Sequence, residues 1–182
     1  MTKSNANKKN ETTTEEPNAS LSIAELEEKY LGKEIISTEV GVCKILSIQK
    51  IDENSDNFFV VESKEGRLRH YFPINGVTKY RFIATKKKLE DILKSINGKL
   101  ERKKYDSKKD RINYFKNISR SQDIHELFIA YIDLCFIEDL GTIEKTIMDR
   151  CFATLVVEYT KVFEISEEEG KELILNKIKE LK

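Results

Sequence analysis

The 182-residue sequence contains no tryptophan, only two prolines and only seven glycines. It has no Gly-rich phosphate loop, no G-x-S-x-G nucleophile motif and no H-E-x-x-H zinc motif. These absences argue against a nucleotide-binding protein, a serine hydrolase or a zinc protease of the common types. Because proline is so rare and 35% of the residues are charged, the composition favours a helix-rich protein over a turn-rich β sandwich.

Residues suited to metal binding or redox chemistry are also few. The three cysteines, Cys43, Cys135 and Cys151, stand in apolar runs without C-x-x-C spacing, so we expect reduced core residues and neither disulfides nor a zinc site. His70 and His125 are far apart in sequence, in a strand and a helix context, and are expected to be structural or surface residues. The sequence therefore predicts no catalytic residue, no metal, no cofactor and no small-molecule substrate.

Long apolar runs are missing as well. No stretch approaches the roughly 18 apolar residues that a membrane helix needs, and residues 1–20 lack the apolar core of a secretion signal. We expect a cytoplasmic protein without membrane contact. Residues 1–20 are almost wholly polar and are predicted to form a disordered tail, because they cannot bury enough apolar surface to offset their ordering entropy.

The charge is balanced overall but unevenly distributed. Lys and Arg equal Asp and Glu at 32 each, yet residues 81–120 carry 14 basic against 5 acidic residues, while residues 121–182 carry 7 against 14. The basic middle stretch is available to phosphates or to an acidic partner. A solvated helical face explains the same pattern without any partner, and both interpretations stay open.

The first half of the chain has the pattern of a small β domain. Ser22 with Glu25 forms a capping-box spacing that predicts a short helix ending before Gly32. Runs rich in β-branched and aromatic residues then predict strands at residues 40–48, 58–62, 68–72 and 80–83. Polar or glycine-containing turns at residues 52–57, 64–66 and 75–76 separate them, so we expect an antiparallel, barrel-like sheet.

The second half has helical periodicity. Apolar residues recur every three to four positions at 89–96, 112–118, 124–135, 143–162 and 173–178, which predicts a bundle of four or five helices. Asn97-Gly98 is expected to end the first helix, Ser121 or Asp123 to cap the third, and Gly141 to mark its end. Thr142 and Ser166 are the expected N-caps of the last two helices. The predicted fold class is α+β, with a β domain at residues 21–85 and a helical domain at 86–182.

Several segments together resemble one known family. These are residues 32–36 (GKEII), 40–48 (VGVCKILSI), 58–63 (FFVVES) and 67–73 (RLRHYFP), then 140–145 (LGTIEK), 155–158 (LVVE) and 165–170 (ISEEEG). The first group is similar to the RNA-polymerase-interacting domain of CarD-like (CdnL) regulators and of transcription-repair coupling factor. The second group resembles the helical domain of CarD-like proteins, which the coupling factor lacks. The likeness covers roughly residues 32–181 and implies a Tudor-like β domain followed by an all-α domain.

The resemblance implies a non-enzymatic transcription regulator that binds the RNA polymerase β subunit. In that family the β domain docks partly by strand-to-strand main-chain contact, in which an exposed edge supplies affinity. The matching segment is Arg67, Leu68, Arg69, His70, Tyr71 and Phe72. Strand alternation is expected to place Leu68, His70 and Phe72 on one face and Arg67, Arg69 and Tyr71 on the other. An ordinary hairpin strand with basic, solvent-facing residues is the alternative interpretation.

The resemblance also implies sequence-independent contact with promoter DNA that stabilises the open complex. Family members use basic residues on phosphates and a tryptophan wedged into the minor groove. Asp106 occupies the expected position of that tryptophan, with Tyr105 and Tyr114 as neighbouring aromatic residues. The DNA-binding candidates are Lys108, Lys109, Arg111 and Lys145.

Two other hypotheses stay open at the level of sequence. Loss of the tryptophan and the acidic C-terminal helices fit a polymerase-binding adaptor that no longer contacts DNA. A small hydrolase or nucleotide-binding enzyme built on an unfamiliar arrangement of acids is the alternative from another functional class.

Overall fold

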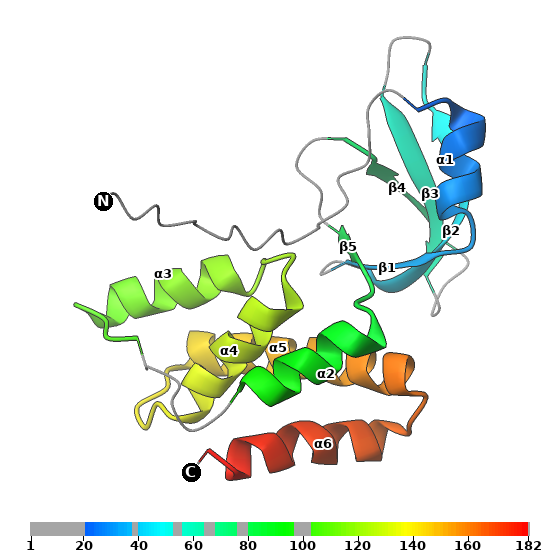
Figure 1. The fold of residues 1–182 in the computed structure, drawn as a ribbon. Coiled ribbons are helices and arrows are strands. Elements are labelled where there is room, and N and C mark those ends of the chain that lie inside the picture. Colours follow the sequence, from blue (N-terminus) through cyan, green and yellow to red (C-terminus); the bar gives the residue numbers. More distant parts are fainter. Residues whose placement is uncertain are drawn as a thin grey trace, which may run out of the picture.

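A computed structural model describes residues 21–37, 40–52, 56–63, 68–75, 80–96 and 103–181. Its architecture is α+β, as predicted: a curled antiparallel sheet in the N-terminal part is followed by helices in the C-terminal part (Figure 1). The predicted tail at residues 1–20 and the predicted turns at 64–66 and 97–98 lie outside the described residues.

A short helix and a sheet make up the N-terminal part. Helix α1 (Ile23–Tyr30) begins with the predicted capping box, in which the backbone N–H of Ser22 donates to Glu25 at 2.8 Å. The described strands form one sheet in the order β4-β3-β2-β1-β5. They are β1 (Glu34–Ser37), β2 (Gly41–Lys50), β3 (Asn57–Ser63), β4 (Arg69–Pro73) and β5 (Tyr80–Phe82).

The four strands expected from composition are confirmed as β2 to β5. Strand β1 was not expected as a separate strand, because four residues are too few to show an alternating pattern. It nevertheless lies inside the sheet, pairing antiparallel with β2 on one side and with β5 on the other.

The C-terminal part contains the remaining helices. These are α2 (Lys86–Ser95), α3 (Lys108–Ile118), α4 (Ile124–Cys135), α5 (Thr142–Phe163) and α6 (Glu167–Lys179). The five helices found in the described residues of this part agree with the predicted number. Asp123 caps α4, with its carboxylate accepting from His125 N–H at 3.0 Å. Ser166 is the predicted N-cap of α6, and Glu169 completes a capping box with it.

Two predicted helix boundaries are wrong. Helix α4 ends at Cys135 and does not continue to Gly141, because the following segment turns away and Asp139 binds Lys108 and Arg111 of α3. The N-cap of α5 is Gly141 and not Thr142. The Glu144 carboxylate accepts the Gly141 N–H at 2.8 Å, so the helix begins one residue earlier than the side chain of Thr142 suggested.

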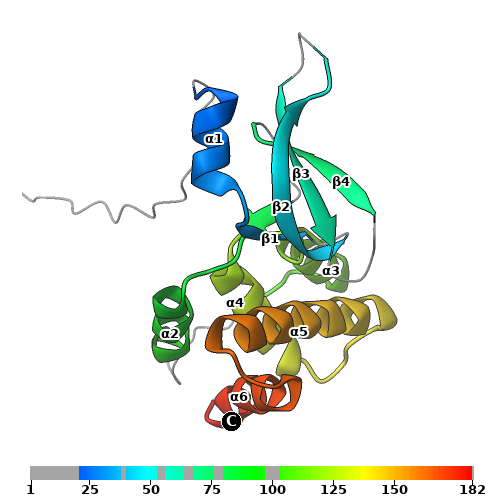
Figure 2. The same ribbon diagram turned by 90° about the vertical axis from the view of Figure 1, so that its right-hand side faces the viewer.

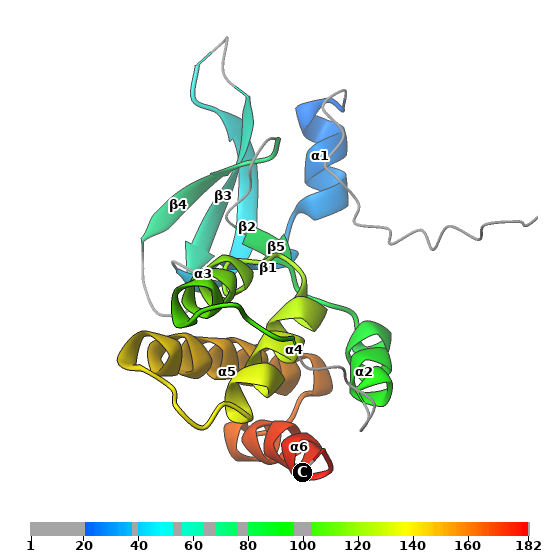
Figure 3. The same ribbon diagram turned by 90° about the vertical axis from the view of Figure 1, so that its left-hand side faces the viewer.

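Buried side chains form two hydrophobic clusters. One lies between the sheet and α1 and includes Tyr30, Phe59 and Tyr80, whose rings pack edge to face. The other lies among the helices, and α4 contributes more buried residues to it than α5 does. Helix α5 lies between the sheet and α6 in all three views (Figures 1, 2 and 3).

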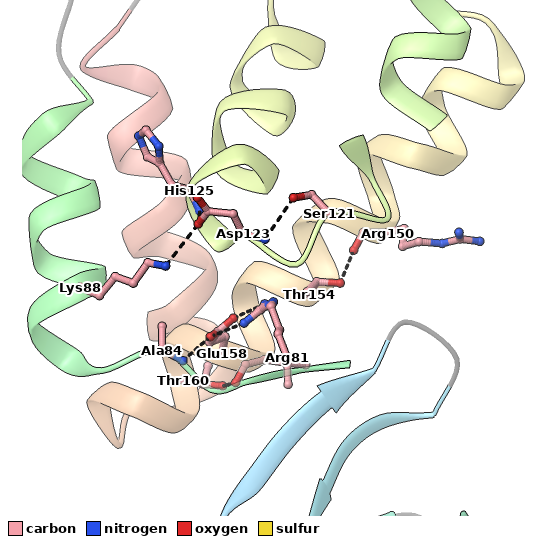
Figure 4. A network of polar contacts seen from close by, with 11 residues as sticks. Arg81, Ala84, Lys88, Ser121, Asp123, His125, Arg150, Thr154, Glu158 and Thr160 are labelled. Carbon is pink, nitrogen blue, oxygen red and sulfur yellow. Dashed lines mark hydrogen bonds and ion pairs between the residues drawn. The ribbon is translucent and has the colours of Figure 1, made fainter. Parts of the chain in front are cut away.

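A buried ion pair joins the sheet to the helices. Arg81 of β5 donates to both carboxylate oxygens of Glu158 of α5, and Glu158 also accepts the backbone N–H of Ala84 at 2.7 Å (Figure 4). Nearby, Lys161 of α5 pairs with Glu34 of β1 at 2.6 Å. Strands β1 and β5 are thus held on α5, while β4 is the strand at the opposite edge of the sheet.

Candidate partner-binding surfaces

Strand β4 is an outer edge of the sheet. Among the described strands it pairs only with β3, in the register Glu62↔Arg69 to Phe58↔Pro73. In Figure 3, β4 faces the viewer and α1 lies on the far side of the sheet. One side of the β4 backbone is therefore not used by the sheet itself.

The register identifies which backbone groups face outward. Ile74 N–H donates to Asn57 O at 2.9 Å, so Asn57 and Ile74, which continue the β3–β4 register, are a hydrogen-bonded pair. Such pairs alternate along antiparallel strands, which assigns Phe72 and His70 to bonds with β3. The N–H and C=O groups of Tyr71 and Arg69 consequently point to the open edge.

The side chains of β4 follow the predicted alternation in part. Phe72 is buried and His70 is half-buried, whereas Arg69 is exposed and Tyr71 is 51% exposed. Leu68 departs from the expectation, because it precedes the strand and is 70% exposed instead of sharing the inner face with Phe72. Arg67 lies outside the described residues. Leu68, Arg69 and Tyr71 are therefore the exposed side chains of this segment.

The predicted DNA-binding residues have different environments. Lys109 and Lys145 are exposed. Lys108 is also exposed, with its ammonium 3.7 Å from the Asp139 carboxylate. Arg111 is only 14% exposed and donates to Glu144 Oε1 at 2.6 Å and to Asp139 Oδ1 at 3.0 Å. The guanidinium of Arg111 is therefore already occupied within the chain.

The charges around Arg111 stabilise one another. Burial alone raises the pKa of Glu144, but hydrogen bonds from Arg111 and from the Gly141 N–H outweigh it and lower that pKa below its usual value. The hydrogen bond from Arg111 likewise lowers the pKa of Asp139. Hydrogen bonds to Glu144 and Asp139 raise the pKa of Arg111. These three residues anchor α3 to the start of α5.

Tyr105 and Tyr114, the aromatic residues near Asp106, pack toward the helical core. The Tyr105 ring lies 5.5 Å from that of Tyr114 and 5.6 Å from that of Phe115, which is fully buried. Burial raises the pKa of both Tyr105 and Tyr114. Asp106 is exposed. An aromatic wedge is therefore not presented at this place.

A further polar surface was predicted from the sequence only at Lys109. The exposed face of α3 and the turn after it carries Lys109, Asn113, Lys116, Asn117 and Arg120. Their spacing of four, three, one and three residues puts them on one side of a helix. The opposite side carries the buried Phe115 and the ion-paired Arg111. The spacing of these five residues in the sequence is the signal that identifies this face.

The comparisons with known proteins give no assignment. No family model matches this chain, and no curated protein matches it. Across the described ranges no group of three or more His, Cys, Asp or Glu residues could hold a metal ion. Of the helices in this part of the chain, none combines the length and apolar character needed to cross a membrane.

Proposed function

We propose that the chain is a transcription regulator that binds the RNA polymerase β subunit through the open edge of β4. The observation that carries this proposal is the outward-facing backbone of Arg69 and Tyr71 beside exposed side chains. An unpaired edge is a ready template for strand addition by another chain. The resemblance of residues 67–73 to the polymerase-contacting strand of CarD-like proteins points to the same strand.

The arrangement of the rest of the chain suits this role. The two hydrophobic clusters support a division into a Tudor-like β domain, residues 21–85, and a helical domain, residues 86–182. The Arg81–Glu158 pair fixes the sheet on α5 at the edge opposite β4, so docking of β4 also sets the position of the helices. The regulator then holds its helical part beside promoter DNA and stabilises the open complex through sequence-independent contacts. Lys109 and Lys145 support this part of the proposal, since both are exposed.

Proline substitution at Tyr71 tests the docking mode. Proline lacks an N–H, and at this position the missing group is one that points away from β3. The variant Tyr71→Pro should therefore keep the sheet but lose a main-chain bond to the partner. We expect capture of purified RNA polymerase by the full chain to fall at least tenfold relative to wild type.

The control for this experiment is Tyr71→Ala, which removes the side chain but keeps the outward N–H. It should weaken capture less than Tyr71→Pro, and thermal unfolding should show that both variants are folded. Failure of the folded wild-type chain to bind polymerase, or equal capture by wild type and Tyr71→Pro, contradicts the proposal.

A second candidate function is a polymerase-binding adaptor that makes no DNA contact. The observation in its favour is the commitment of Arg111 to Glu144 and Asp139, together with the inward packing of Tyr105. Promoter opening by polymerase, measured with and without the chain, separates the two functions. Under the adaptor hypothesis, replacing Lys109 and Lys145 by Glu leaves promoter opening unchanged.

A further inference from the structure

The outward face of α3 is unusual in its charge. It presents three cations, Lys109, Lys116 and Arg120, and two amides, Asn113 and Asn117, with no carboxylate between them. None of the three cations forms an ion pair with a carboxylate in the described part of the chain. Cations elsewhere on the helices do form such pairs, as with Lys88 to Asp123 at 3.3 Å and Arg111 to Glu144 at 2.6 Å.

The geometry of this face is fixed by the packing beneath it. Phe115 is fully buried in the helical core, and Arg111 is tied to α5, so α3 cannot rotate without breaking both interactions. From Lys109 to Arg120 the face extends over eleven residue steps, or about 16 Å at about 1.5 Å per residue. The carboxylate of Asp110 at its border accepts a hydrogen bond from Ser107 Oγ at 2.6 Å in the N-terminal cap.

We propose that this face of α3, defined by Lys109, Asn113, Lys116, Asn117 and Arg120, binds the phosphate backbone of duplex DNA. A duplex carries about one negative charge per 1.7 Å of its axis, so a row of cations about 16 Å long faces several phosphates at once. Asparagine side chains donate hydrogen bonds to phosphate oxygens and complete the row.

The composition of the face favours nucleic acid over an acidic protein. Protein interfaces have an apolar or aromatic centre and are depleted in lysine, whereas protein–DNA interfaces are more polar and positively charged. None of the large hydrophobic residues that the structure exposes in its described ranges belongs to α3. A row of cations and amides without an apolar centre matches the second kind of interface.

The position of α3 agrees with docking through β4. In Figure 3, α3 and β4 lie on the side of the molecule that faces the viewer, with β4 above α3. A chain held by β4 therefore keeps helix α3 on the side of the molecule where polymerase is bound. The choice of promoter DNA as the duplex rests on the proposed function, while the cationic face itself does not.

Neutralisation of the three cations is the direct test. The full chain with Lys109→Gln, Lys116→Gln and Arg120→Gln is titrated against a fluorescent duplex of mixed sequence over a range of salt concentrations. Each phosphate contact contributes about 0.9 unit to the slope of log affinity against log salt, so the slope should fall by about 2.7 units. At low salt we expect affinity to fall at least tenfold.

The matched control carries Lys50→Gln, Lys87→Gln and Lys94→Gln. These lysines are also exposed but belong to β2 and α2, and the change in net charge is the same. The control should bind duplex DNA with the slope of the wild type. A second variant, Asn113→Asp with Asn117→Asp, leaves the cations in place and puts two negative charges on the face. It should weaken binding as well, so the proposal stays testable if the triple variant does not fold.

Three outcomes overturn the inference. In the first, the folded α3 variants bind duplex DNA as tightly as the wild type does. In the second, the control variant loses as much DNA affinity as the α3 variants. In the third, the chain binds polyglutamate as tightly as a duplex of the same charge. The last result assigns the face to an acidic protein. Polymerase capture by the same variants keeps this inference separate from the proposed function, because β4 is unchanged in all of them. If capture fails for the wild type while DNA binding depends on α3, the proposed function fails and the α3 assignment stands.

Discussion

Arg81 and Glu158 lie 77 residues apart in sequence and form a bidentate ion pair between β5 and α5. Both residues are buried, so water is almost excluded from the pair. Glu158 is completely buried. Its carboxylate also accepts a hydrogen bond from the Ala84 N–H, where the chain passes from the sheet to α2. Burial of a charge is costly unless a partner compensates it, so each residue is tolerated inside only because of the other.

Removal of one partner should therefore destabilise the fold more than removal of both. We expect Glu158→Leu to lower the free energy of unfolding by about 3–5 kcal/mol, because Arg81 is then left buried without a counter-charge. The double variant Arg81→Met, Glu158→Leu should lose less than the sum of the single changes. Urea unfolding of the four proteins measures this coupling. If the single variants lose little unfolding free energy and their losses add up to that of the double variant, the ion pair does not stabilise the fold.

The pair of Arg111 and Glu144 should give a pH-dependent stability. The folded-state pKa of Glu144 lies below its usual value of 4.5, so the pair stabilises the fold above that pH. The contribution disappears as the pH falls through the lowered pKa. The variant Glu144→Gln should be less stable than wild type by about 2 kcal/mol at pH 7, a typical value for a charged hydrogen bond. The two unfolding free energies should converge as the pH falls from 4.5 through the lowered pKa of Glu144.

The matched control for this pH series is Glu169→Gln. The pKa of Glu169 is also lowered, by hydrogen bonds from the backbone and side chain of Ser166, but Glu169 is exposed. Its replacement should have a much smaller effect at pH 7. A difference between wild type and Glu144→Gln that is constant from pH 7 to pH 3 contradicts the assignment.

These two ion pairs also show where sequence reasoning ends. Local signals were sufficient for the caps at Ser22 and Ser166, because donor and acceptor lie three residues apart and no other part of the chain decides the outcome. The alternation of burial along the strands was predictable for the same reason. Arg81 and Glu158 gave no such signal, since nothing in their neighbouring residues shows that they meet.

The candidate surfaces were predictable to different degrees. The β4 segment was found from its strand pattern and its resemblance, but its place at the edge of the sheet depends on the order of the strands. Arg111 was predicted to contact DNA because it lies at the loop–helix start that resembles the family's DNA-contacting segment. Its position on α3 instead directs it toward Glu144. Lys116 and Arg120 were not selected, although they lie on the exposed side of the same helix.

Gly170 gives a test of helix packing that sequence alone did not suggest. A Cβ atom added at Gly170 of α6 lies 2.5 Å from Cγ2 of Thr160 of α5, which is closer than real contacts allow. The helix propensity of alanine favours Gly170→Ala by about 1 kcal/mol, but we expect the clash, typically about 1–3 kcal/mol, to outweigh it. The thermal unfolding midpoint of Gly170→Ala should therefore fall.

Thr160→Ser removes the clashing methyl group and keeps the hydroxyl that donates to Val157 O at 3.0 Å. In this background Gly170→Ala should become neutral or stabilising, because only the gain in helix propensity remains. Destabilisation of equal size with and without the Thr160 methyl group means that the contact is not the cause.

Glu164, at the end of α5, has a left-handed backbone conformation with φ 56°. This conformation costs a residue with a Cβ atom about 1–2 kcal/mol and is easy for glycine. The carboxylate also lies at the negative end of the helix dipole, where it is unfavourable. Both arguments predict that Glu164→Gly raises the free energy of unfolding. Part of this gain is offset, because glycine makes the unfolded chain more flexible.

Glu164→Ala separates the two contributions, since it removes the charge but keeps the Cβ atom. We expect Glu164→Gly to be more stable than Glu164→Ala by about 1 kcal/mol, a difference that is independent of salt because both variants lack the charge. Urea unfolding at low and high salt measures it. Equal unfolding free energies of the two variants mean that α5 ends without conformational strain. A higher unfolding free energy for Glu164→Gly places the strain at the turn between α5 and α6. In this turn the Ile165 N–H donates to Thr160 O at 3.1 Å and the chain reverses into α6.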